Sequence, residues 1–135
     1  SWLSGLPPSN VWIGTTVEDQ RRADERIPHL LATPARVRFL SCEPMLGEID
    51  LKLDTWSPEI ELERGDGIGW VIVGGESGPG ARPMQLEWAR SLVEQCKNAG
   101  VACFVKQDSG RMPGTQGQIP NELWLKEFPD AAQRS

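Results

Sequence analysis

Short apolar runs alternate along the chain with segments in which apolar residues recur every three or four positions. Runs rich in β-branched and aromatic residues are typical of β-strands. They occupy residues 11–17, 37–44, 70–75 and 101–107. Two other segments have the helical period and predict helices, at residues 18–32 and 84–100.

Both predicted helices carry signals at their ends. The first begins with Glu18 and Asp19, and acidic residues favour a helix N-terminus. Pro28 lies inside this segment, so we expect the helix to be shortened or kinked there. The second helix is predicted to stop between Asn98 and Gly100, because asparagine and glycine commonly end helices.

The remaining segments show weaker patterns. Residues 45–69 contain charges and glycines throughout, with a weak apolar period at Ile49, Leu51 and Leu53. We expect a short helix or an irregular crossover there. Residues 108–135 form a loop-rich tail. We expect three apolar residues to dock this tail on the rest of the chain: Trp124, Leu125 and Phe128.

The order of these elements predicts an α/β fold. Nearly continuous apolar strands separated by helices favour a parallel sheet buried on both faces. A chain of 135 residues has the length of one domain and can bury a core, so residues 1–135 are interpreted as a single α/β domain.

Composition narrows the class of protein further. The net charge of -5 weakens the case for nucleic-acid binding, which needs a surplus of basic residues. No apolar run approaches the ~20 residues of a membrane helix, and the first residues do not resemble a signal peptide. We therefore expect a cytoplasmic protein with no membrane association.

The cysteines and the histidine give no catalytic or metal signature. Cys42, Cys96 and Cys103 lack CxxC spacing, and we expect buried, inert thiols and no metal site. His29, the only histidine, is expected to be a surface or packing residue and not a catalyst. The tryptophans, Trp12 and Trp70 among them, are interpreted as packing residues. We find no Ser–His–Asp or Cys–His constellation.

Polar residues gather where the predicted strands end. Parallel α/β sheets bind ligands at the C-terminal ends of their strands. Here the strands begin with apolar residues and end with polar ones, an asymmetry that favours a functional rim over ordinary solvated loops. The candidate ligand-binding residues are Glu43, Gly74, Gly75, Glu76, Ser77, Arg82, Lys106 and Gln107.

These candidates suggest a site for a small molecule. Glu43, Glu76 and Lys106 are the ionisable contacts. Gly74 and Gly75 allow close approach of a ligand, and the following N–H groups could bind an anion with help from Arg82. Glu76 could instead accept hydrogen bonds from an amine or a ribose. The segment "GGESGPG" matches neither a Walker loop nor a dinucleotide fingerprint, and a plain tight turn is equally compatible with it.

Three motifs carry a resemblance to a known family. In chain order they are "SCEP", "GGESGPGARP" and "FVKQ", within the longer stretches "VWIGTTVEDQRRADERIPHLLATPARVRFLSCEPMLGEIDL" and "WVIVGGESGPGARPMQLEWARSLVEQCKNAGVACFVKQ", followed by "ELWLKEFP" in the tail. They closely resemble the phage gene-product-thirty-seven/gene-product-sixty-eight family, whose members are mostly of unknown function. The resemblance covers nearly the whole chain.

The resemblance implies a particular architecture. Longer members look like radical S-adenosylmethionine proteins, in which three clustered cysteines near the N-terminus hold an iron–sulfur cluster within a (β/α) barrel. This chain resembles the C-terminal half of such a TIM-like barrel. S-adenosylmethionine and a [4Fe–4S] cluster would belong to the full-length protein, with no cofactor bound within this chain. The "GGE" at residues 74–76 follows a late strand, so we do not assign it the methionyl-binding role of a similar motif.

Three hypotheses for function follow. The first is the substrate-side half of a radical enzyme, catalytically incomplete alone. The second is a non-catalytic binding or assembly module that uses an exposed sheet edge, and the third is a small hydrolase with Glu43 and Glu76 as an acid–base pair. Because four strands of a barrel leave two exposed edges, we expect either a homodimer or pairing with an N-terminal half.

Overall fold

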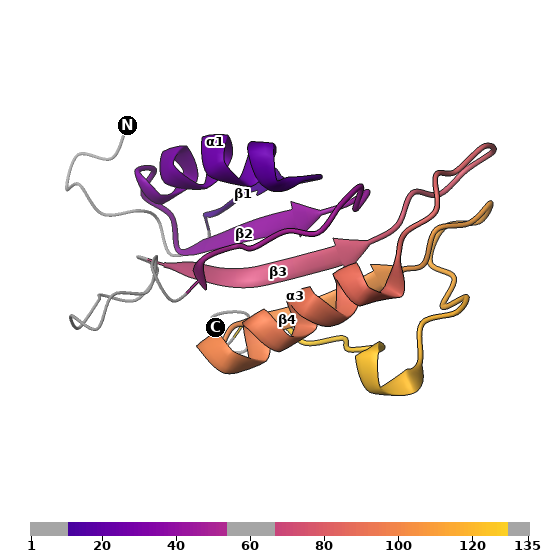
Figure 1. Ribbon diagram of the computed structural model, residues 1–135. Helices are drawn as coiled ribbons and strands as arrows, with labels where there is room; N and C mark the ends of the chain where they lie inside the picture. Colours follow the sequence, from indigo (N-terminus) through magenta and orange to yellow (C-terminus); the bar gives the residue numbers. More distant parts are fainter. Residues whose placement is uncertain (1–10, 54–66, 130–135) are drawn as a thin grey trace.

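A computed structural model describes residues 11–53 and 67–129 (Figure 1). Its elements follow the predicted order of strands and helices. They are β1 (Trp12–Thr16), α1 (Gln20–Leu31), β2 (Val37–Cys42), β3 (Ile68–Gly74), α3 (Leu86–Ala99), β4 (Ala102–Gln107) and the short 3-10 helix η1 (Asn121–Leu123). All the predicted strands and both predicted helices are confirmed. No helix in the described ranges is long and apolar enough to cross a membrane.

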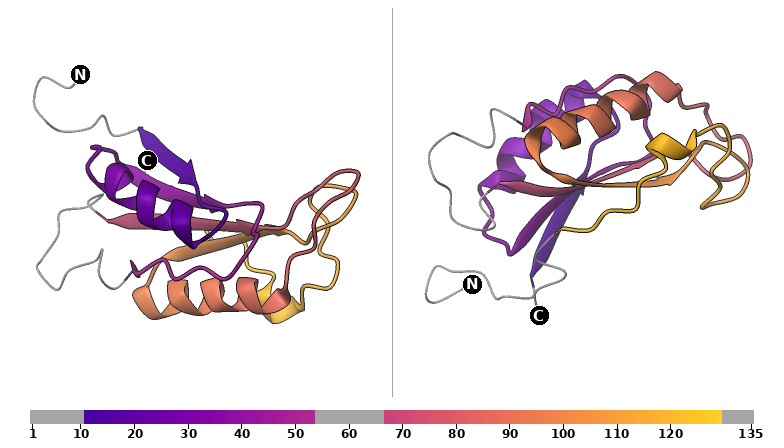
Figure 2. Two further views of the ribbon diagram at one scale, coloured as in Figure 1. Left: turned by 45° about the horizontal axis from the view of Figure 1, so that its top comes forward. Right: turned by 90° about the horizontal axis from the view of Figure 1, so that it is seen from below.

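The strands form one parallel sheet in the order β1-β2-β3-β4. The predicted α/β class is therefore confirmed. Right-handed crossovers between strands in sequential order place the connecting helices on one side of the sheet. Figure 2 shows α1 and α3 on the same face. Among the described elements, helices therefore cover one face only, whereas the apolar strands had suggested that both faces would be covered. We call the opposite side the helix-free face.

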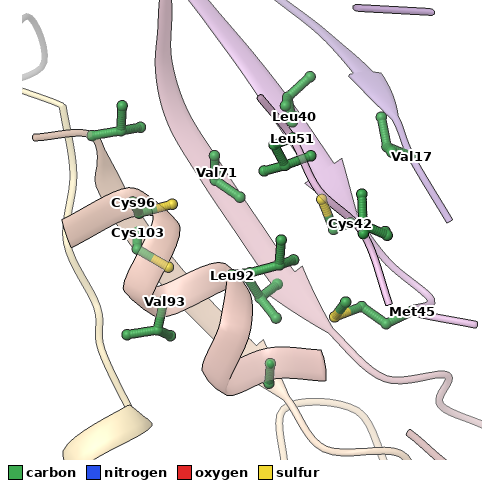
Figure 3. Close-up of a cluster of buried hydrophobic side chains, with 14 of the residues drawn as sticks. Val17, Leu40, Cys42, Met45, Leu51, Val71, Leu92, Val93, Cys96 and Cys103 are labelled. Carbon is green, nitrogen blue, oxygen red and sulfur yellow. The ribbon is translucent and has the colours of Figure 1, made fainter. Parts of the chain in front are cut away.

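The main core lies between the sheet and these helices (Figure 3). Leu40 and Val71 project from the sheet, and Leu92 projects from α3; all three are fully buried. Figure 3 shows Cys96 beside Cys103 in the same cluster. Large side chains of this kind interlock when alternate residues of the strands and one face of the helix point toward each other.

The cysteines are buried and unpaired, as predicted. Cys42, Cys96 and Cys103 are all free thiols. Burial raises the pKa of Cys42 above the ordinary thiol range. A hydrogen bond with Cys103, together with burial, raises the pKa of Cys96. Because the thiolate is the reactive form, these shifts favour inert thiols.

The helix ends follow the sequence signals. The Asp19 side chain caps α1 by accepting a hydrogen bond of 3.0 Å from the Arg22 N–H. The helix continues through Pro28 to Leu31, so the proline does not end it. Gly100 ends α3 with a φ of 69°, a left-handed conformation that glycine adopts without strain.

The backbone at residues 49–51, in the described part of the crossover after β2, is irregular and is held by glutamines from the two helices. The N–H and C=O of Asp50 bond to the Gln20 side chain at 2.7 and 2.9 Å. Gln95 donates to the Ile49 carbonyl at 2.8 Å and accepts from the Leu51 N–H at 2.9 Å. Ile49, Leu51 and Leu53, which form the weak apolar period, are all buried. The sequence predicts a short helix or an irregular crossover over residues 45–69, and residues 54–66 of that segment lie outside the described residues.

The tail covers the outer edge of β4. Residues 125–127 run antiparallel to this strand: the Val105 N–H donates to the Leu125 carbonyl at 2.8 Å, and the Glu127 N–H donates to the Cys103 carbonyl at 3.0 Å. The Phe128 ring contacts Trp70 and Phe104, with centroids 5.5 Å apart in both pairs. The predicted docking of the tail is thus confirmed. Within the described ranges, no strand pairs with the outer edge of β1.

Candidate functional site

The helix-free face changes in character along the strands. Near the strand starts it carries aromatic rings that contact one another. The Trp70 ring lies 5.9 Å from both Trp12 and Phe39, and Phe39 covers Gly14, where a Cβ would lie 2.2 Å from the Phe39 ring. Trp12 and Trp70 are packing residues as predicted, but they pack on the helix-free face and not in the main core. This part of the face is filled by the chain itself.

The middle of the face is less polar than the rim, by which we mean Glu43, Gly74 and Lys106 at the C-terminal ends of the strands. Thr16, Ser41, Ile72 and Phe104 lie in register across the four strands. Ser41, Ile72 and Phe104 are half-buried, so each keeps part of its surface accessible. We call these three residues the floor.

The C-terminal ends of the strands carry an ion pair beside the floor. Lys106 of β4 places its Nζ 3.2 Å from both Oε1 and Oε2 of Glu43, which follows β2. Gly74, at the end of the intervening β3, leaves room for this contact, because a Cβ there would lie 3.1 Å from Glu43 Oε2, closer than most side-chain contacts. The exposed fractions of the side chains are 21% for Glu43 and 48% for Lys106, so solvent and solutes reach the pair.

Glu76 and Arg82 form a separate pair within one loop. Arg82 donates from its Nη2 to Oε2 at 2.7 Å, and from its Nε and its backbone N–H to Oε1 at 2.9 and 2.8 Å. These hydrogen bonds lower the pKa of Glu76 to about 2. The Gly78 N–H donates to the Gly110 carbonyl at 3.0 Å. Several groups proposed for a ligand thus have partners inside the protein, while Ser77 is exposed.

Gly75 and Gln107 join two loops behind the rim. The buried Gln107 side chain donates to the Gly75 carbonyl at 2.7 Å and accepts from the Gly114 N–H at 2.9 Å. A Cβ at Gly75 would lie 2.3 Å from the Ser109 backbone nitrogen. Gln107 therefore links the backbones at Gly75 and Gly114, and Gly75 lets its own backbone approach that of Ser109 closely.

Apart from the exposed Ser77, the candidates separate into three groups. Glu43, Gly74 and Lys106 share one site on the helix-free face, Glu76 with Arg82 braces its own loop, and Gly75 with Gln107 joins backbones. Two features were missed from the sequence. Asp108 is buried and accepts from the Ser109 and Gln118 N–H groups at 2.7 and 2.8 Å. The floor was also missed, although the alternate spacing of Ile72 with Gly74 and of Phe104 with Lys106 signals it.

Acid should expose the contribution of the Glu76–Arg82 pair. Folding lowers the pKa of Glu76 from 4.5 to about 2. The pair therefore stabilises the folded protein fully at pH values above 4.5, the pKa of this glutamate in the unfolded chain. That contribution should disappear as the pH falls from ~5 to ~2. We expect E76Q to lose less of its unfolding free energy than the wild type over this interval, measured by urea denaturation.

The exposed pair Arg21–Glu25 provides the control for this experiment, since it is also an Arg–Glu contact, at 3.1 Å. E25Q should keep the acid dependence of the wild type. Identical pH slopes for E76Q and the wild type would contradict the assignment of the low pKa to this pair.

The described residues do not fit an iron–sulfur cluster. No group of three or more His, Cys, Asp or Glu side chains in residues 11–53 and 67–129 could hold a metal ion. Cys42, Cys96 and Cys103 lie on β2, α3 and β4 and are buried in the core. They therefore cannot serve as a surface-accessible ligand set.

Comparison with known proteins gives a family and no function. A family model described as "Protein of unknown function (DUF5131)" matches residues 2–125. No curated protein matches the chain, and no solved structure matches it.

Proposed function

The chain belongs to the DUF5131 family of proteins of unknown function, and we propose that it forms the substrate-side portion of a (β/α)-barrel enzyme of the radical S-adenosylmethionine type. The resemblance of "SCEP", "GGESGPGARP" and "FVKQ" to the phage family supports the enzyme class. The sequential parallel sheet, with its described helices on one face, suits a segment of such a barrel.

One observation carries the proposed site: the Glu43–Lys106 pair at the C-terminal ends of the strands, on the face that would line the barrel. Barrel enzymes bind their substrates at this end. In the proposal, Glu43 and Lys106 bind and orient a small substrate, and Gly74 leaves the space in which they meet. The aromatic rings near the strand starts close the other end of the interior.

The chain's own residues supply binding and orientation. Because its described cysteines do not fit a cluster, the iron–sulfur chemistry of the proposed enzyme belongs to a preceding segment. Glu43 and Lys106 are assigned only the binding and orientation of the substrate, and no part in the chemistry of the cluster.

The experiment uses the whole natural protein, purified without oxygen. We expect the purified protein to contain iron and sulfide. With a reductant, it should cleave S-adenosylmethionine to 5′-deoxyadenosine. The small-molecule fraction of host cells should increase the rate of this cleavage, and we call that increase the stimulation. E43Q and K106M should lower the stimulation about 10- to 100-fold, which corresponds to the loss of a hydrogen bond to a charged group. Their iron content should remain unchanged.

K52M is the matched control, because it removes an exposed Lys52–Asp24 contact of 3.3 Å away from the rim. It should leave the stimulation intact. A natural protein without iron would overturn the enzyme class, and full stimulation in E43Q would overturn the assignment of the site.

The second candidate, a non-catalytic assembly module, is favoured by the unequal sheet edges. The tail occupies the outer edge of β4, whereas β1 has no strand on its outer side in the described ranges. A partner, either a second copy or an N-terminal half, would add its strand at β1. The hydrolase hypothesis has less support, because an acid–base pair needs a raised pKa and that of Glu76 is lowered.

A further inference from the structure

The outer edge of β1 presents backbone groups to which no strand in the described ranges is paired. The carbonyl of Val11 and the N–H of Val17 bond to β2, at 2.8 and 2.9 Å. The odd-numbered residues of β1 therefore direct their backbone groups toward β2. Because these groups alternate in direction along a strand, those of Trp12, Gly14 and Thr16 point outward.

One of the outward groups has a partner from α1. Arg26 donates from its Nη1 to the Thr16 carbonyl at 2.8 Å and to the Thr16 hydroxyl at 3.0 Å. An added strand would therefore meet five remaining groups: the N–H and C=O of Trp12, the N–H and C=O of Gly14, and the N–H of Thr16. Residues 12–16 contain no lysine or proline, and their pairing with β2 has no bulge, so the edge has none of these barriers to further pairing.

These five groups suit a parallel strand better than an antiparallel one. In antiparallel pairing, a hydrogen-bonded residue exchanges both its N–H and its C=O bonds with one partner residue. Thr16 cannot do so without competing with Arg26 for its carbonyl, so an antiparallel strand would use only the four groups of Trp12 and Gly14. In parallel pairing the bonds are evenly spaced along the strand, and the ladder can end at the Thr16 N–H.

A cavity beside β1 gives a second sign of an added segment. It has a volume of about 230 Å³ and borders β1 on the side covered by α1. Its lining residues are Thr15, Arg26, His29, Leu30 and Thr33. Since Arg26 also reaches the outward carbonyl of Thr16, this cavity adjoins the outer edge. A side chain of a strand added at this edge could enter it.

We propose that the β1 edge binds a parallel strand from outside residues 1–135. A second copy is disfavoured, because two-fold symmetry would pair β1 with its own copy in antiparallel orientation. Residues 1–10 are too few to supply the strand, because a parallel connection needs a dozen or more residues. The added strand needs an N–H group, and hence no proline, at the two positions that donate to the carbonyls of Trp12 and Gly14. This inference rests on the assembly surface in the proposed function and selects between its two partners.

The test is hydrogen exchange of the whole natural protein, resolved to single amides. Ile13 and Thr15, whose amides face β2, are the internal reference. We expect the amides of Trp12, Gly14 and Thr16 to exchange within about 10-fold of this reference, because both sets are hydrogen-bonded between strands. In residues 1–135 alone, the three outward amides should exchange at least about 100-fold faster than the reference.

Two variants connect the protection to the ladder. Thr16→Pro removes one outward N–H, and proline is tolerated where the N–H of an edge strand faces outward. In the natural protein this change should speed exchange at the Gly14 amide about 10-fold, because the neighbouring bond is lost. Thr16→Val keeps the N–H and, like proline, lacks the hydroxyl that Arg26 contacts, so it should exchange like the wild type. Slow exchange at Ile13 checks that each variant is folded.

The outcomes also separate this inference from the enzyme class. Fast exchange at Trp12 and Gly14 in the natural protein would overturn the inference, and so would equal protection in residues 1–135 alone. A close Hα–Hα contact in NMR between Ile13 and the added strand would reveal antiparallel pairing and overturn it as well. Slow exchange in a natural protein without iron would keep the inference and overturn the enzyme class. Bound iron with fast exchange at this edge would do the reverse.

Discussion

Replacing Gly75 with alanine should destabilise the protein by about 3 kcal/mol or more, among the largest effects expected of a single methyl group. The added Cβ would lie 2.3 Å from the Ser109 nitrogen, 2.7 Å from the Ser109 Cα and 2.9 Å from the Asp108 carbonyl carbon. All three are backbone atoms, which cannot rotate away as a side chain can. The loop after β4 would therefore have to move away from β3.

Gly47→Ala is the control for the effect of alanine itself. A Cβ at Gly47 has no atom within 4 Å, and its φ is not in the left-handed region. Such a substitution should be neutral or should stabilise by up to ~1 kcal/mol, because alanine lowers the entropy of the unfolded chain. Urea denaturation of both variants gives the comparison. A Gly75→Ala protein as stable as Gly47→Ala would show that the two loops do not pack as closely as described.

The Gly75→Ala substitution should also change the position of Lys106 in the rim. If the loop after β4 moves, Lys106 should move with it, because Lys106 directly precedes Gln107 and the backbone that Gly75 contacts. A folded Gly75→Ala protein should therefore have weaker ligand binding as well as lower stability. The two glycines that end β3 thus have different roles: Gly74 leaves room for a carboxylate, and Gly75 leaves room for a backbone.

The elements could be predicted because their signals are local. Alternation and helical period are properties of neighbouring residues, and the helices end at residues of the expected types, such as Gly100. The rim was also predictable in outline, since parallel strands bring their C-terminal ends together whatever the exact register. Thus the sequence alone identifies both Glu43 and Lys106 as candidates, although they lie 63 positions apart.

The partners of the candidate residues could not be predicted in the same way. A carboxylate at a strand end can turn toward a ligand or toward its own loop, and the choice depends on loop conformation. Glu76 turns to Arg82, six residues later, whereas Glu43 turns across β3 to Lys106. The register between β3 and β4 also shifts between Val73 and Gly74, and no pattern in the sequence indicates such a shift.

The backbone contacts of the tail and of the crossover could not be predicted from the sequence, for a related reason. Residues 125–127 pair with β4 through backbone groups, which leave almost no trace in side-chain patterning. The side chains of Gln20 and Gln95 hold the irregular backbone of residues 49–51. Each of these contacts joins segments distant in sequence, so only the assembled fold identifies them.

Gln107→Leu should cost about 2 to 3 kcal/mol of unfolding free energy, although leucine has a similar volume and suits a strand. Gln107 is 2% exposed, and its side chain donates to the Gly75 carbonyl at 2.7 Å and accepts from the Gly114 N–H at 2.9 Å. Leucine can replace neither bond. The Gly114 amide can turn to water because Gly114 is exposed, so most of the cost should arise at buried Gly75.

Gln20→Leu separates the effect of burial from the number of hydrogen bonds. Gln20 also makes two hydrogen bonds to backbone groups, those of Asp50, but in a solvent-exposed setting where water can replace it. This variant should lose about 1 kcal/mol or less. Denaturation of both leucine variants, with hydrogen exchange at the Gly114 amide, makes the comparison: faster exchange is expected in Gln107→Leu alone. Equal losses of stability would mean that burial of Gln107 adds nothing and that the backbone near Gly75 does not depend on this side chain to hold the rim in place.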